Sequence, residues 1–128
     1  MGSELHARLW RDNADLAGIC LEHAFIRGLK DGSLDHRAFR RYIAQDAFFL
    51  AAFARGYAMC AAACTRIADL RVFYELQGGV LEELEVHANY AASMNIDLQA
   101  VRPFAETTAY TEFLLRTGAT RSLARQRF

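Results

Sequence analysis

The sequence predicts an all-α protein. Apolar residues recur at helical spacing along most of the chain, whereas the alternating β-branched stretches typical of strands are nearly absent. Two segments interrupt the helical pattern: GLKDGSLD, which leads to the N-cap candidate Asp35, and NIDLQAVRPF, which contains the single proline, Pro103. A further break is expected near 65–69. We therefore predict one domain over residues 1–128 with four helices, at about 4–27, 36–64, 69–93 and 106–124.

The composition limits the classes of partner. Fifteen basic and fifteen acidic residues cancel, so no strong field favours nucleic acid or an anionic membrane as a partner. No apolar run reaches about 18 residues, and the charged N-terminal stretch lacks the apolar centre of a signal peptide. The three cysteines fit no zinc pattern. Reduced thiols are typical of the cytoplasm, where we expect the protein to reside.

The predicted helix 36–64 has a charged residue within its apolar face. At about 100° per residue, six side chains fall within an arc of roughly 80°, and the arc is apolar or aromatic except at one position. Its members are Phe39, Ile43, Asp46, Leu50, Phe53 and Tyr57. An unpaired buried carboxylate is costly, so Asp46 should face a polar partner or a ligand.

Two other predicted helices also direct ionisable groups inward. His23 belongs to the apolar face of helix 4–27, and His87 belongs to that of helix 69–93. Each histidine can be either a hydrogen-bonded core residue or a ligand. Glu83 lies four residues before His87, so these two side chains can touch and orient each other inside the bundle.

These residues lie in three segments that resemble, in the right order, the TenA (thiaminase II) family. The first, HAFIRGLKDGSLDHRAFRRYIAQDAFFLAAFAR, is similar to the family's opening, in which a DGTL-like turn leads to an F-x-x-Y-x-x-QD helix. The second, VLEELEVHANYAASMNIDL, resembles the family's E-x-x-x-H helix. The third, TTAYTEFLLRTGATRSLA, resembles its A-Y-T-x-F-L-L helix. Together the segments cover nearly the whole chain.

The resemblance implies a haem-oxygenase-like helical bundle that hydrolyses aminopyrimidines or thiamine in thiamine salvage, and we expect neither a cofactor nor a metal. In this family an aspartate of the QD helix holds the aminopyrimidine and aids a nucleophilic cysteine. Asp46 matches that aspartate, and Tyr110 matches a tyrosine that lines the same pocket. Phe49 stands where many relatives carry a tyrosine. The expected substrate-binding residues are therefore Asp46, Phe49 and Tyr110, with Glu83 and His87 as a supporting polar pair.

The family's nucleophilic cysteine and catalytic glutamate have no counterpart here, because the chain reads RQRF after Ala124. Cys20, Cys60 and Cys64 lie at other positions. We expect residues 1–128 to be the N-terminal helices of a larger bundle, without catalytic residues and inactive alone. Hydrophobic residues make up 53% of the sequence, which is more than one small core readily buries. We therefore expect a homo-oligomer, a dimer or tetramer, that forms through the second or fourth predicted helix.

Two other classes of function stay open. One is a non-catalytic helical module that binds a small aromatic ligand or assembles with partners. The other comes from further users of the fold: haem bound through His23, or a metal bound through Glu83 and His87. Metal-using relatives carry a glutamate seven residues before the histidine, and Val80 at that position counts against a metal.

Overall fold

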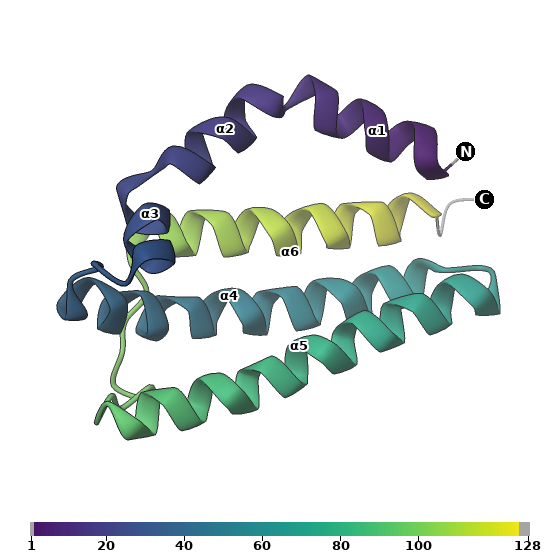
Figure 1. The fold of residues 1–128 in the computed structure, drawn as a ribbon. Coiled ribbons are helices and arrows are strands. Elements are labelled where there is room, and N and C mark those ends of the chain that lie inside the picture. Colours follow the sequence, from purple (N-terminus) through teal and green to yellow (C-terminus); the bar gives the residue numbers. More distant parts are fainter. Residues whose placement is uncertain (1, 126–128) are drawn as a thin grey trace. The chain divides into compact units, whose positions relative to one another are not determined.

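The computed structural model describes residues 2–125, and the side chains of residues 4–120. The described part is helical throughout, with short connections and no strand, so the all-α prediction is confirmed. None of its helices has the length and hydrophobicity to span a bilayer. The helices are α1 (Gly2–Asp12), α2 (Ala14–Glu22), α3 (Ala24–Asp31), α4 (His36–Ala63), α5 (Ile67–Ser93) and α6 (Ala105–Arg125) (Figure 1).

Two side chains divide the predicted helix 4–27 into α1, α2 and α3. The side-chain amide of Asn13 donates to the carbonyl of Leu9 at 2.8 Å, at the junction of α1 and α2. His23 adopts an extended backbone, with φ −62° and ψ 138°, and its ring nitrogen Nδ1 accepts the N–H of Phe25 at 3.1 Å. His23 is thus an exposed N-cap, and its predicted place on an inward apolar face is wrong.

The chain divides into two compact units, residues 1–39 and 40–128. In the first, Gly32 ends α3 in the left-handed conformation, with φ 77°. Gly28 allows a close approach, since a Cβ atom there would lie 3.1 Å from the backbone of Leu34. Asp35 then caps α4, as predicted, by accepting the N–H groups of Arg37 at 2.8 Å and Ala38 at 3.2 Å.

In the second unit α4 lies between α5 and α6, antiparallel to α5 and parallel to α6 (Figure 1). Gln77 of α5 donates to the carbonyl of Ala54 at 3.1 Å, and the guanidinium of Arg40 donates to the carbonyl of Met94. Buried alanines, such as Ala52 and Ala91, let the helices approach closely. This packing presents the apolar face of α4 to both neighbours.

Gln45 attaches the start of α6 to α4. Its side-chain N–H donates to the carbonyl of Arg102 at 3.0 Å. Its side-chain oxygen accepts the N–H of Phe104 at 2.9 Å and the hydroxyl of the buried Thr107 at 2.7 Å. Because Phe104 directly precedes α6, Gln45 satisfies a backbone donor that the helix itself leaves unpaired. The contact sets the register between α4 and α6.

Replacing the buried Ile43 should destabilise this core. Its side chain is 3% exposed, whereas Ile67 is 73% exposed. We expect Ile43→Ala to lower the free energy of unfolding by about 2–5 kcal/mol, because it leaves a cavity in the core. The control, Ile67→Ala, should change it by less than about 0.5 kcal/mol. Urea unfolding followed by circular dichroism measures both, and equal losses would show that α4 does not pack as described.

Candidate functional site

Asp46 lies on the face of α4 that meets α5, where Tyr42 donates a hydrogen bond to it and His87 approaches it at ion-pair distance. Its side chain is 21% exposed, and that of His87 is 9% exposed. The Nε2 atom of His87 lies 3.5 Å from a carboxylate oxygen of Asp46 and 3.1 Å from the carbonyl oxygen of Ile43. The hydroxyl of Tyr42, one turn before Asp46, also hydrogen-bonds to the carboxylate. The polar partner expected for a buried carboxylate is therefore present.

Burial raises the pKa of Asp46 above its ordinary value, because the ionised form loses solvation. The charge that His87 carries when protonated and the hydrogen bond from Tyr42 oppose this shift, while the nearby charge of Glu83 adds to it. The pKa of Tyr42 is raised as well, first by burial and then by the carboxylate of Asp46. The tyrosine therefore keeps its proton and acts as a donor.

An aromatic row begins at Phe49, three residues after Asp46 on α4. The rings of Phe49 and Tyr110 stack, with centroids 4.5 Å apart and planes inclined by 26°. The row continues along α4, since Phe49 stacks on Phe53 at 6.0 Å and Phe53 meets Tyr57 at the same distance. Tyr110 is 44% exposed, so part of its ring is free to meet a ligand. The structure thus brings together Phe49 and Tyr110, which are 61 positions apart in the sequence.

The expected contact between Glu83 and His87 does not occur. Glu83 is exposed, and no hydrogen bond or ion pair joins these two side chains, both of which are described. His87 instead turns across the helix interface to α4, because a carbonyl and a carboxylate converge there. Glu83 influences the site only through its charge, which raises the pKa values of Asp46 and Tyr42.

The residue analysis missed Tyr42 and Gln45, although both belong to the F-x-x-Y-x-x-QD pattern. Tyr42 precedes Asp46 by four residues, so helical spacing already places the two on one side of α4. Gln45 binds residues 57 to 62 positions away. Only the pattern itself could have drawn attention to it.

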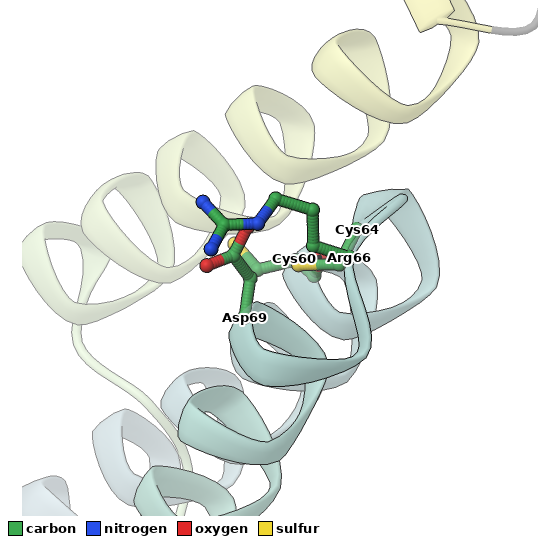
Figure 2. A network of polar contacts seen from close by, with 4 residues as sticks. All are labelled: Cys60, Cys64, Arg66 and Asp69. Atoms are coloured by element: carbon green, nitrogen blue, oxygen red, sulfur yellow. Dashed lines mark hydrogen bonds and ion pairs between the residues drawn. The ribbon is translucent and has the colours of Figure 1, made fainter.

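A cavity of about 390 Å³ lies further along α4, and Asp46 is not among its lining residues. Its lining is mostly apolar and aromatic and includes Cys60 and Cys64. The thiol of Cys64 donates to the carbonyl of Cys60 at 3.2 Å, and Arg66 and Asp69 form an exposed ion pair nearby at 4.0 Å (Figure 2). Among the residues with described positions, no three His, Cys, Asp or Glu side chains cluster to hold a metal.

The site and the helices around it define a class of protein, a helical bundle with a partly buried carboxylate and a pair of stacked aromatic rings on the same helix, α4. A profile of the TENA/THI-4/PQQC family matches residues 10–126. The match covers most of the chain, and the protein therefore belongs to this family, as the resemblance of its three segments predicts.

Several proteins of known name are similar in sequence. The chain is 37% identical over 92 residues to the mitochondrial bifunctional TH2 protein of Arabidopsis thaliana, covering 71% of this chain and 15% of that protein. It is 31% identical over 105 residues to an aminopyrimidine aminohydrolase of Halalkalibacterium halodurans, covering 79% of this chain and 47% of the relative. The chain thus spans about half the length of this aminohydrolase and a smaller part of the TH2 protein.

Solved structures support the fold. A TenA family transcription regulator from Silicibacter sp. TM1040 superposes with a TM-score of 0.76 at 30% identity, over 84% of this chain and 51% of that one. A TenA homologue from Pyrococcus furiosus superposes with a TM-score of 0.83 at 22% identity, over 93% of this chain and 55% of that one. At that identity the second match shows the helical-bundle fold alone.

The pKa of Asp46 makes a prediction about stability and pH. A carboxyl group whose pKa is raised by folding contributes its full stabilisation when the pH is below its ordinary pKa of about 3.8. This stabilisation is lost as the pH rises through the folded-state pKa. Asp46→Asn, a neutral isostere, should therefore raise the melting temperature near neutral pH, and the gain should shrink toward acid pH. Thermal unfolding across this range measures it. The exposed control Glu75→Gln should show no such pH-dependent gain, and a loss of stability in Asp46→Asn near neutral pH would contradict the prediction.

Proposed function

We propose that this chain recognises the aminopyrimidine in a thiamine-salvage hydrolase of the aminopyrimidine aminohydrolase (thiaminase II) type. The observation that carries the proposal is the carboxylate of Asp46, contacted by Tyr42 and His87 and located three residues before Phe49, whose ring stacks on that of Tyr110. The names of relatives support it, because several of them are aminopyrimidine aminohydrolases.

The chemistry of an aminopyrimidine suits these side chains. Its flat ring can stack on an exposed aromatic face such as that of Tyr110. Its exocyclic amine is a donor, and a carboxylate offers about four lone-pair positions, of which Tyr42 occupies one and the ring of His87 approaches another. Asp46 therefore has acceptor capacity left for the amine. The partly buried position strengthens this hydrogen bond relative to water.

We propose further that residues 1–128 do not complete the reaction, because the nucleophile and its acid partner come from polypeptide outside them. Cys60 and Cys64 line the apolar cavity, which Asp46 does not reach, and Cys20 is exposed in the first unit. A nucleophilic thiol needs an adjacent base or a lowered pKa. The thiol of Cys64 donates to the carbonyl of Cys60, which is neither a base nor a positive charge.

We propose that copies of the chain associate through α5 and α6. In α4 the only large apolar side chain that is exposed is Tyr42, so the expected interface on this helix is not favoured. The described part of the other two helices exposes more apolar surface, which typically marks an interface. Apart from Tyr110, which the proposed ligand site uses, the exposed side chains there are Leu70, Val72, Tyr74, Leu76, Leu81, Val86, Tyr90 and Phe113.

Asp46 should govern the binding of the exocyclic amine. We expect calorimetry to show that 4-amino-5-aminomethyl-2-methylpyrimidine binds the chain, and that Asp46→Ala weakens binding by about 10- to 100-fold, the loss of one hydrogen bond to a charged group. Asp97→Ala, an exposed carboxylate of the same unit, is the matched control and should leave the affinity unchanged.

A pyrimidine without the 4-amino group separates recognition of the amine from general weakening. It should bind wild type and Asp46→Ala equally, because neither complex has the amine hydrogen bond. Chromatography of the mixtures with the aminomethyl compound should reveal no hydroxymethylpyrimidine, the alcohol that hydrolysis of the aminomethyl group would produce. Equal binding of the amino compound by wild type and Asp46→Ala, or steady turnover by residues 1–128, would each contradict its part of the proposal.

A charge on α5 should break the proposed oligomer. Tyr74 is 69% exposed, and a buried carboxylate at this position would be costly in an apolar interface. We expect light scattering at micromolar concentration to show a dimer or tetramer for wild type and a smaller species for Tyr74→Glu. The neighbouring Glu75→Gln should keep the wild-type mass. A monomeric wild type would refute the association.

A further inference from the structure

His87 is fixed by two acceptors on one nitrogen. Its Nε2 atom faces the carbonyl oxygen of Ile43 at 3.1 Å and a carboxylate oxygen of Asp46 at 3.5 Å. A carbonyl oxygen only accepts, so Nε2 must carry a hydrogen whether the ring is neutral or charged. The opposite neutral tautomer would aim a lone pair at two oxygens. The surroundings thus select the Nε2–H form.

The shorter contact is the one to the backbone, and this makes the ring an anchored donor. The carbonyl of Ile43 belongs to the same helix as Asp46, three residues earlier, so the donor is held in place relative to the carboxylate by α4 itself. The residue is 7% exposed, and the ring of Tyr42 packs edge-on against it with centroids 6.4 Å apart. The ring has little freedom to turn away.

We propose that His87 is a positioning residue for Asp46: its Nε2–H, aligned by the Ile43 carbonyl, holds the carboxylate in the orientation that receives a ligand's amine. This rests on the proposed function, in which Asp46 binds an aminopyrimidine. A carboxylate rotates freely about its terminal bond in water, and a fixed donor removes part of that freedom before the ligand arrives. Tyr42 supplies a second donor from the same helix.

A purely structural histidine would give a different pattern of mutant effects. If His87 only fills space and satisfies Ile43, its loss weakens the fold by the same amount whether or not Asp46 is present. If it acts through Asp46, its loss changes ligand affinity only while the carboxylate is there. A double-mutant cycle separates these two cases.

The binding experiment uses calorimetry with 4-amino-5-aminomethyl-2-methylpyrimidine. His87→Leu should weaken binding by about 3- to 10-fold in the wild-type background, as expected for a neutral hydrogen bond, and should cause no further loss in the Asp46→Ala background. His87→Gln, whose amide nitrogen reaches the place of Nε2, should retain wild-type affinity. His87→Asn, whose amide is too short, should resemble His87→Leu. Equal losses in both backgrounds would overturn the proposal.

A measurement without ligand separates this proposal from the proposed function. NMR titration of the Asp46 carboxyl carbon should give a higher pKa in His87→Leu and His87→Asn than in wild type. His87→Gln should give a smaller rise, because its amide keeps the donor but not the charge that a protonated His87 places beside the carboxylate. Tyr42 of α4 and Glu83 of α5, the other groups that act on this carboxyl, are the same in all these variants.

Negative results in the two measurements refute different proposals. If wild type binds no aminopyrimidine but the titration shifts as expected, the proposed function fails and the hold of His87 on Asp46 stands. If the titration of Asp46 is the same in wild type, His87→Leu and His87→Asn, the positioning role is refuted whatever binds. Should His87→Leu not fold, as judged by circular dichroism, the comparison of His87→Gln with His87→Asn decides the question.

Discussion

The side-chain amide of Gln45 connects two of the three long helices of the second unit, because it sits on α4 and binds the segment that begins α6. Its oxygen accepts from both Phe104 and Thr107, while its nitrogen donates to the carbonyl of Arg102. One turn further along each helix, Phe49 and Tyr110 stack. The stack of Phe49 and Tyr110 therefore depends on the hydrogen bonds of Gln45, the residue that directly precedes Asp46.

The second constraint is the cost of burying a carboxylate. Burial raises the pKa of Asp46, and the charge of a protonated His87 and the hydrogen bond from Tyr42 offset only part of this effect. A protein selected for stability alone would have little use for such a group, whereas a binding site needs an acceptor that water does not compete for. The same partial burial connects the expected stability gain of Asp46→Asn with the expected loss of affinity when the carboxylate is removed.

Local sequence patterns predicted the long helices well and the N-terminal region poorly. The range 36–64 agrees with α4 to within a residue, because Asp35 caps its start and its apolar face is continuous. The single helix expected over 4–27 is three helices, since the side chains of Asn13 and His23 bond to the local backbone. Hydrophobic periodicity does not reveal such competition, because both residues leave the spacing of their apolar neighbours unchanged.

The sequence by itself determined the fold class, the family, and the presence of a carboxylate on the apolar face of α4, because these follow from periodicity and local pattern. Only the tertiary structure decided which side chains meet that carboxylate. Spacing within one helix paired His87 with Glu83, but the packing of α4 against α5 turned the imidazole to Ile43 and Asp46. The family resemblance assigned Phe49 and Tyr110 to one site, but only the structure showed that their rings stack. Contacts between helices depend on how their faces pack and in what register, and that information is not contained in any single helix.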